Sequence, residues 1–157
     1  MKDKNAQGKA GVIPHLVCEP CGEAIDFYVK AFGAVEQFRM ATPDGGRIMH
    51  AAITIDGHAV FLASDFPEYC GGHSRSPKAL GATPVTLHRF VADCDAAIRK
   101  AEKAGATVVM PATDMFWGDR YGMVTDPFGH SWSLATHQRD LTPAEIERGM
   151  KEAFAQG

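Results

Sequence analysis

The sequence contains no long hydrophobic run. None of its apolar segments approaches the roughly 20 residues that a membrane-spanning helix requires, and residues 1–9 are polar, without the apolar stretch of a secretory signal peptide. The chain also lacks any block of basic residues, and its net charge of only −3 gives no electrostatic basis for binding nucleic acid. We therefore expect a cytoplasmic protein that binds neither membranes nor nucleic acids.

Cysteine is scarce as well. The chain has four cysteines, and in a cytoplasmic protein these are thiols rather than disulfides. The rest of the composition is that of a globular protein, with 45% hydrophobic and 22% charged residues in 157 positions, which is the length of one ordinary domain. A chain of this size buries enough apolar surface to form a core without covalent cross-links.

One order of predicted elements occurs twice. The first half contains strand 12–18, a helix with an apolar face that ends at Gly33, and strands 35–40, 48–55 and 59–63. The second half contains strand 84–91, a helix that Asp93 caps and that ends at Gly105, and strands 107–110, 121–125 and 131–136. Each half is therefore predicted to be a βαβββ module.

Residue identities recur with the elements. His15 and His88 are 73 positions apart (88 − 15), and Cys21 and Cys94 share that offset. An offset of 72 then relates further pairs, namely Gly33 and Gly105, Gly57 and Gly129, His58 and His130, Leu62 and Leu134, and Ala63 and Ala135. A fixed period of this kind indicates an internal repeat.

The predicted fold class is α+β, with two tandem βαβββ modules that form a curved mixed β-sheet groove, helices outside, and a short C-terminal helix. We divide the chain into a leader (1–11), one domain (12–140) and a helical tail (141–157). Module one is 12–64, a turn-rich linker is 65–82, and module two is 83–137. The tail helix has a capping box and an apolar stripe that needs a surface, either on its own body or on a partner subunit.

Equivalent positions of the two modules should face each other across the groove, which predicts that His15 approaches His88. His50 joins them if its strand turns it inward, and three histidines suit a catalytic metal with an open position. The candidate ligand-binding residues are His15, His88, His50, Phe116, Trp117, Tyr121 and Trp132. The alternatives are hydrogen-bonded histidines at the groove floor, an edge position for His50, and core packing for Trp132.

Cys18 and Cys21 form a CxxC motif at a predicted strand-to-helix junction. A helix N-terminus lowers the pKa of a thiol, which allows a redox or metal role. No second CxxC is present, and Cys94 takes the place of Cys21 in the repeat, which favours a small buried residue at a helix start. Both interpretations stay open.

Several motifs resemble the vicinal oxygen chelate superfamily, which holds glyoxalase I, extradiol dioxygenases, fosfomycin-resistance enzymes and bleomycin-binding proteins. These motifs are the helix segment Ala24–Tyr28 and the turn segment Asp126–His130. Phe116–Gly122 and His130–His137 look most similar to the PhnB-like branch. The resemblance covers about residues 12–140 and implies the paired-module fold.

The resemblance also implies a divalent metal held by a histidine from each first strand and a carboxylate from each last strand. In this sequence the two carboxylate positions are Phe61 and Ser133, and the two histidine positions fall nearer Ile13 and Thr86. The four-ligand site of the family is therefore not carried over. Members of the family commonly form homodimers, and the Phe116–Trp117 loop and the tail helix are candidates for that contact.

Two functional hypotheses follow. The first is a small-molecule binding protein without covalent chemistry, which the missing carboxylates and the aromatic residues favour. The second is a metal-dependent lyase, isomerase or dioxygenase with a rewired site, in which His15, His88 and His50 hold a divalent ion. A structural protein with a collapsed groove is a third possibility.

Overall fold

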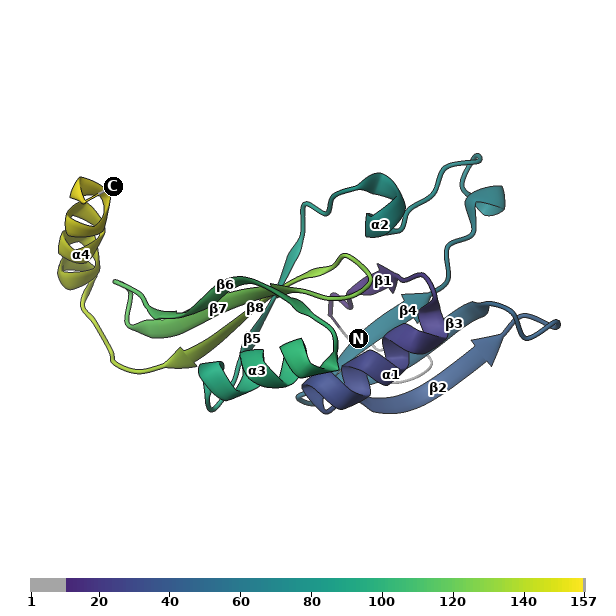
Figure 1. Ribbon diagram of the computed structural model, residues 1–157, viewed down its shortest axis with the longest axis horizontal. Coiled ribbons are helices and arrows are strands. Elements are labelled where there is room, and N and C mark those ends of the chain that lie inside the picture. The colour runs from purple at the N-terminus through teal and green to yellow at the C-terminus, as the bar shows by residue number, and fades with distance from the viewer. Residues whose placement is uncertain (1–10, 157) are drawn as a thin grey trace, which may run out of the picture.

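The computed structural model describes residues 11–156 and has an α+β architecture of two four-stranded sheets, with α1 and α3 side by side along one side (Figure 1). The elements are, in order, β1 (His15–Val17), α1 (Cys21–Phe32), β2 (Val35–Ala41), β3 (Ile48–Ile55), β4 (His58–Ala63), the 3₁₀ helix η1 (Pro67–Tyr69), α2 (Pro77–Leu80), β5 (Thr86–Phe90), α3 (Cys94–Ala104), β6 (Thr107–Asp114), β7 (Asp119–Thr125), β8 (Ser131–His137) and α4 (Pro143–Ala155). The prediction of two tandem βαβββ modules is confirmed. The expected leader lies, except for Gly11, outside the described residues.

The two modules share one strand order. Module one has the order β1-β4-β3-β2 and module two has β5-β8-β7-β6. In each module the first strand runs parallel to the last, and the other neighbours are antiparallel. His15 pairs with Phe61 across β1 and β4, and His88 pairs with Ser133 across β5 and β8. Residues that the sequence matched between the two halves therefore take equivalent places.

Local sequence signals set the ends of the helices. Gly33 ends α1 in the left-handed region at φ 66°, a conformation that costs glycine little. The carboxylate of Asp93 accepts a 2.9 Å hydrogen bond from the backbone N–H of Ala96 and so begins α3. Thr142 and Glu145 form the predicted capping box of α4.

Alternating burial places one face of each sheet against a helix. In module one, Leu16, Ile53 and Leu62 are buried beneath Ile25 and Tyr28 of α1. Burying one such aliphatic side chain contributes about 1.5–3 kcal/mol. The residues between them in the strands point to the other face, and β2 is exposed along its whole length.

Asp126 joins the two modules. Its carboxylate accepts hydrogen bonds from the Tyr28 hydroxyl at 2.6 Å and the Trp132 indole N–H at 2.9 Å. It also accepts from the backbone N–H groups of Phe128 and His130, both at 2.9 Å. One buried carboxylate thus satisfies four donors and ties α1 of module one to the turn and last strand of module two.

Three segments differ from the sequence prediction. β1 is only three residues long, because Pro14 has no N–H to donate and Val12 is fully exposed. β6 continues past Met110 to Asp114, with register shifts on either side of Met110 that accommodate Pro111. The third segment is the turn-rich linker, in which the short helices η1 and α2 add detail that the sequence did not predict.

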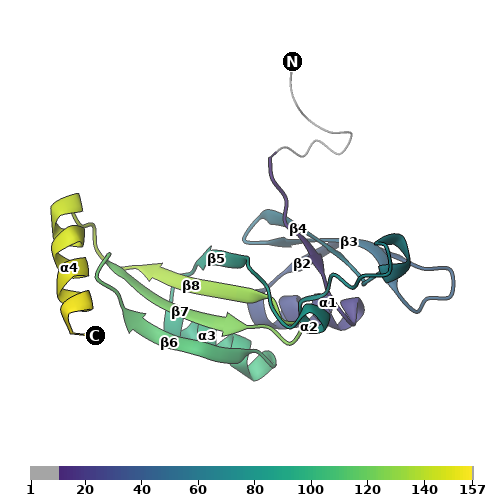
Figure 2. The same ribbon diagram turned by 90° about the horizontal axis from the view of Figure 1, so that it is seen from above.

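The helix α4 stands apart from the rest of the chain in both views (Figures 1 and 2). None of its residues is buried, and Phe154 of its apolar stripe is 78% exposed. It approaches the body where Gly149 meets Phe116, so closely that a Cβ at position 149 would lie 3.1 Å from the Phe116 Cβ. Among residues 11–156, no helix combines the length and hydrophobicity that a bilayer crossing requires.

Candidate functional site

Each sheet leaves one face uncovered by helices, and the predicted site residues gather on these faces. On module one, His15 is exposed beside its parallel neighbour Phe61, while the alternate residue Leu16 points into the core. On module two, His88 and Phe90 are exposed, while Leu87, which precedes His88, packs against the core. Because successive side chains of a strand point to opposite faces of the sheet, the core residues lie on one face and the candidate ligand contacts lie on the other.

The module-one cluster consists of His15, His50, Phe61 and Phe38. The rings of His15 and His50 meet edge to face with centroids 5.7 Å apart. Phe61 lies 6.0 Å from His15 and 4.8 Å from His50, and Phe38 lies 6.3 Å from His50. β3 therefore turns His50 toward His15, and both histidines border the same apolar surface.

The module-two cluster consists of His88, Phe90, Tyr121, Trp117 and Phe116. The His88 ring stacks on Tyr121 with centroids 6.1 Å apart and meets Phe90 at 4.7 Å. Trp117 lies 5.6 Å from Tyr121, and Phe116 lies 5.0 Å from Trp117. These aromatic rings form a continuous row, which can stack on a flat ligand.

His88 makes one further contact that sets its orientation. Its Nδ1 lies 2.7 Å from the Ser133 hydroxyl oxygen on β8. Ser133 stands at the position where the family resemblance implies a carboxylate. A hydroxyl can exchange a hydrogen bond with a neutral imidazole, but it does not supply the negative charge or the basicity of the carboxylate that the resemblance implies at this position.

Trp132 belongs to the junction of the modules rather than to either cluster. It is 3% exposed, and its ring packs 5.5 Å from Tyr28 and 4.7 Å from Phe32. Its indole N–H is already bound to Asp126. The structure therefore places it in the core, with one edge reaching the wall of the cleft between the modules.

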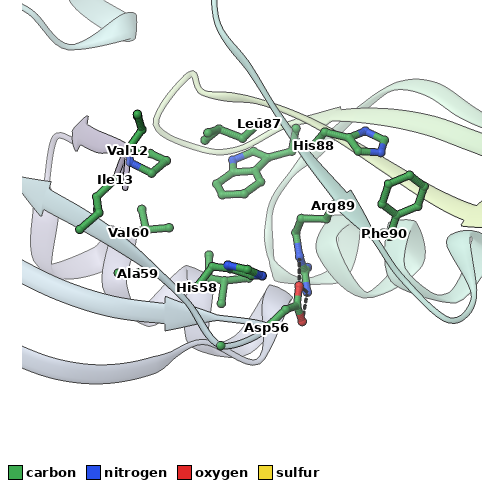
Figure 3. Close-up of a pocket in the computed structure, with 14 residues that line it drawn as sticks. Val12, Ile13, Asp56, His58, Ala59, Val60, Leu87, His88, Arg89 and Phe90 are labelled. Carbon is green, nitrogen blue, oxygen red and sulfur yellow. Dashed lines mark hydrogen bonds and ion pairs between the residues drawn. The ribbon is translucent and has the colours of Figure 1, made fainter. Parts of the chain in front are cut away.

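That cleft has a volume of about 570 Å³ and lies between the β3–β4 hairpin and β5 (Figure 3). An ion pair crosses it, with Nη2 of Arg89 2.7 Å from the Asp56 carboxylate. The Arg89 guanidinium also lies 4.7 Å from the centroid of the Phe32 ring, and its side chain is only 11% exposed. The cleft is thus bridged by a contact that holds the modules together.

The structure brings His15 and His50 together, but it does not bring His88 to them within one chain. The ring contacts of His15 go to module one, and those of His88 go to module two. Among the described residues, no group of three or more His, Cys, Asp or Glu side chains is placed to hold a metal ion. With Phe61 and Ser133 at the carboxylate positions, the donor set of this chain does not fit the four-ligand site of the family.

The environment of His15 disfavours its charged form. Burial lowers the pKa of His15, and the neighbouring His50 and Arg75 lower it further. Arg75 belongs to the turn-rich linker 65–82, which was predicted only to connect the two modules. The sequence contains one indication of this contact, because a turn-rich stretch of Gly and Pro residues can fold back over a sheet face as well as connect two modules.

The cysteine motif is a packing feature. Cys18 and Cys21 are free thiols and are at most 2% exposed. Burial raises the pKa of Cys18 well above its usual value and raises the pKa of Cys21 to about 12. A thiol that stays protonated and covered is a poor nucleophile, so the structure favours the structural interpretation.

Comparisons with known proteins agree with these motifs. Residues 13–134 match the family model described as the Glyoxalase/Bleomycin resistance protein/Dioxygenase superfamily. The chain is 53% identical over 137 residues to the "Uncharacterized protein Mb0911c" of Mycobacterium bovis, which covers 87% of this chain and 90% of that protein.

Solved structures show the same architecture. The X-ray structure of a gene product from Arabidopsis thaliana (AT5G48480) has a TM-score of 0.65 and 26% identity over 81% of this chain and 98% of that chain. A PhnB protein from Bacillus cereus has a TM-score of 0.59 and 16% identity over 81% of this chain and 99% of that chain. The second likeness is one of fold. The chain therefore belongs to the Glyoxalase/Bleomycin resistance protein/Dioxygenase superfamily, and a PhnB-like protein is among its structural neighbours.

Proposed function

We propose that the protein binds a small, flat, largely apolar molecule non-covalently on its uncovered sheet faces. The observation that carries this proposal is the pair of aromatic–histidine clusters, whose rings remain partly or fully accessible although aromatic side chains gain most from burial. No member of either cluster is itself a carboxylate, and the adjoining Asp119 already accepts a 3.1 Å hydrogen bond from the Trp117 indole N–H, so the groups that line these faces can stack and exchange hydrogen bonds. The ligand-contacting residues we propose are His15, His50, His88, Phe116, Trp117 and Tyr121.

A second copy of the chain completes this site. Three large apolar side chains on the uncovered faces are about half exposed or more, namely Phe38 at 51%, Met40 at 46% and Phe90 at 65%. Patches of this kind on a monomer mark interaction surfaces. A homodimer that sets the module-two face of one copy over the module-one face of the other encloses both clusters in one cavity and covers these side chains.

The alternative is a metal-dependent enzyme with a rewired histidine site. It is favoured by one contact, the 5.7 Å approach of the His15 and His50 rings, which offers two nitrogen ligands on one face. A third ligand from His88 has to come from the second copy, because the two clusters are separate within one chain. Mass spectrometry of untagged protein, beside His15→Ala and His88→Ala, tests this alternative. Stoichiometric metal that is lost in both variants would replace the binding proposal.

Fluorescence quenching by the neutral nitroaromatic 4-nitrobenzyl alcohol tests the binding proposal itself. The chain has two tryptophans, of which Trp117 lies in the module-two cluster and Trp132 in the core. We expect saturable quenching of the native protein, and its loss in Trp117→Phe, where only the covered Trp132 remains. Quenching that rises linearly without saturation, with the same slope in both proteins, would contradict binding at the cluster.

A further inference from the structure

A second, smaller cavity adjoins the module-one cluster. It has a volume of about 290 Å³ and lies where the linker crosses the end of the uncovered face. His15, Val17 and Ala63 contribute the sheet wall, and the linker wall includes Tyr69 and Arg75. A cavity of this size accepts one functional group with a small ring, which is less than a whole drug-sized ligand requires.

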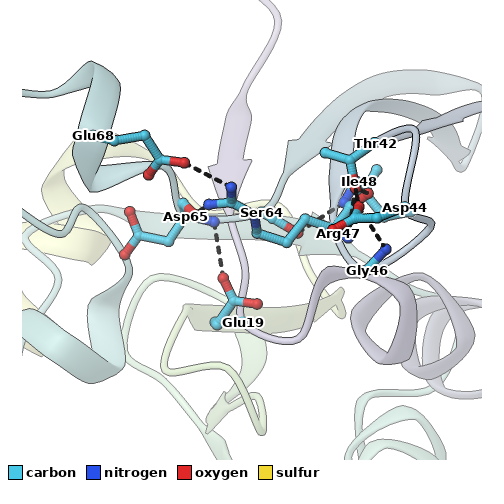
Figure 4. A network of polar contacts seen from close by, with 9 residues as sticks. All are labelled: Glu19, Thr42, Asp44, Gly46, Arg47, Ile48, Ser64, Asp65 and Glu68. Carbon is cyan, nitrogen blue, oxygen red and sulfur yellow. Dashed lines mark hydrogen bonds and ion pairs between the residues drawn. The ribbon is translucent and has the colours of Figure 1, made fainter.

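Asp65 holds the linker wall in place through its carboxylate, and Figure 4 shows the contact of its backbone with Glu19. Its carboxylate accepts hydrogen bonds from the Ser74 hydroxyl and from the backbone N–H groups of Arg75 and Ser76, the latter two at 3.2 Å. Its own backbone N–H donates to Glu19 at 2.9 Å. The backbone at position 75 is therefore fixed by a buried side chain, which is the kind of preorganisation that a binding site requires.

Arg47 adds a second brace to this wall. It donates to the Asp65 carbonyl at 3.3 Å and forms an ion pair with Glu68 at 2.6 Å. Its guanidinium also lies over the Phe66 ring, 4.2 Å from the centroid. These contacts anchor the start of the linker to the turn before β3, so that the wall does not depend on the ligand for its shape.

Arg75 differs from the arginines that stabilise the fold. Four of those form ion pairs with carboxylates, namely Arg39, Arg47, Arg89 and Arg120. Within residues 11–156, the Arg75 guanidinium has no carboxylate within 4.0 Å, and the contact it makes is a weak one of 3.6 Å to the Cys70 sulfur. The carboxylate of Asp65 lines the same cavity, but the Ser74 hydroxyl and two backbone amides already occupy it.

We infer that this cavity recognises a carboxylate group on the ligand, with Arg75 as its principal contact and His15 as the second. A guanidinium presents two parallel N–H groups that match the two oxygens of a carboxylate. The imidazole of His15 stands on the opposite wall and supplies a further N–H. Burial lowers the pKa of His15, and the nearby His50 and Arg75 lower it further, so Arg75 contributes positive potential at this ring.

This inference rests on the proposed function and narrows it to aromatic carboxylates. The carboxylate lies between Arg75 and His15, and the attached ring extends over Phe61 and His50 of the module-one cluster. The neighbouring Tyr69, which is 77% exposed, stands at the rim of the cavity. The proposed ligand is therefore charged at one end, which matches the cavity, and apolar along the rest of its length, which matches the module-one cluster.

Isothermal titration with sodium benzoate and with neutral benzamide, at equal ionic strength, tests the inference. The two probes have nearly the same shape and differ in charge. We expect benzoate to bind at least tenfold more tightly than benzamide, and Arg75→Gln to remove that preference. Arg99→Gln is the matched control, because Arg99 is an exposed arginine on α3 outside this cavity, and we expect it to leave the preference unchanged.

The outcomes separate this inference from the proposed function. Equal affinity for benzoate and benzamide, or a preference that survives Arg75→Gln, would overturn the carboxylate inference. If 4-nitrobenzyl alcohol still quenches Trp117 saturably in that case, the proposed function stands without it. If none of the three probes binds, both the inference and the proposed function are wrong. Urea unfolding of Arg75→Gln that matches the native protein shows that the variant is folded.

Discussion

The junction between the modules and the uncovered sheet faces use the same residue types in opposite ways. At the junction, Tyr28 and Trp132 are buried, and their polar atoms are bound to Asp126. On the faces, Tyr121 and Trp117 remain accessible, and their ring faces meet other aromatic rings and a histidine. Aromatic residues with satisfied polar atoms in a core serve stability, whereas accessible aromatic rows serve recognition. The expected effects of substitutions follow from this division.

The largest effect is expected at the junction. Asp126→Ala leaves four donors without their acceptor in a buried place, which costs roughly 3–5 kcal/mol of unfolding free energy. Urea denaturation followed by far-ultraviolet circular dichroism measures the loss. Phe38→Ala is the contrasting variant on the uncovered face, and we expect it to cost less than about 1 kcal/mol because its side chain is 51% exposed. Similar losses in the two variants would contradict the division.

The next effect concerns self-association. Phe90→Glu places a charge on the uncovered face of module two, and burying it in a dimer interface is costly. We expect the dissociation constant of the dimer to rise at least tenfold, as measured by sedimentation velocity across protein concentrations. Val29→Glu is the control, because Val29 is 43% exposed on the helical side of the molecule. A dimer that tolerates Phe90→Glu but not Val29→Glu would place the interface on the helices.

A smaller effect is expected at the ion pair that crosses the cleft. Arg89→Met and Asp56→Asn each remove one partner of the 2.7 Å contact. Since the Asp56 side chain is 51% exposed, solvent screening limits the coupling to about 1 kcal/mol or less. A double-mutant cycle in urea measures it. A coupling near zero would mean that Arg89 stabilises the junction through the Phe32 ring alone.

The smallest effect is a pH dependence of benzoate binding. Burial, with smaller contributions from His50 and Arg75, lowers the pKa of His15 from its usual value, so the neutral ring is favoured and protonation increases as the pH falls. A bound carboxylate favours the protonated ring, so the affinity for benzoate rises as the pH falls. We expect a rise of about threefold between pH 7.5 and 5.5, because a carboxylate in a partly exposed site raises the pKa of a histidine by well under one unit.

The charged groups that face His15 are His50 on β3 and Arg75 in the linker, with Asp65 on the same wall. Because His50 carries a second imidazole on this face, His15→Gln and His50→Gln are compared by titration calorimetry at both pH values. We expect the pH dependence to flatten most in His15→Gln. An affinity that falls with decreasing pH in the native protein would contradict the assignment.

The fold was largely predictable from the sequence, because its signals are local. Gly33, Asp93 and the Thr142–Glu145 capping box fix helix ends within one turn, and the 72–73 residue offset predicts that one module follows another. The site was only partly predictable. The internal repeat indicated that His15 and His88 occupy equivalent positions in their modules. The distance between the two side chains depends on how the modules pack, which no local pattern in the sequence records.

Two parts of the site needed the structure. Trp132 and Tyr121 are both aromatic residues of module two, yet one is core and the other is accessible, because α1 of module one packs over Trp132. Arg75 could not be recognised, since its place in the same cavity as His15 depends on hydrogen bonds of Asp65 within an irregular segment. Neither arrangement leaves a periodic pattern in the sequence.

Histidine ring chemical shifts test the central claim most directly, because the seven histidines sample every region of the molecule. His15, His50 and His88 lie in the two clusters, His58 lines the cleft between the modules, and His130 is bound to the Val17 carbonyl at 2.9 Å in the junction. In a titration with 4-nitrobenzyl alcohol, we predict saturable shifts of His15, His50 and His88, with His58 and His130 unchanged. Saturable shifts of His58 while His15 and His50 stay unchanged would place the ligand in the cleft, which His88 also lines, and would contradict a binding site on the uncovered faces.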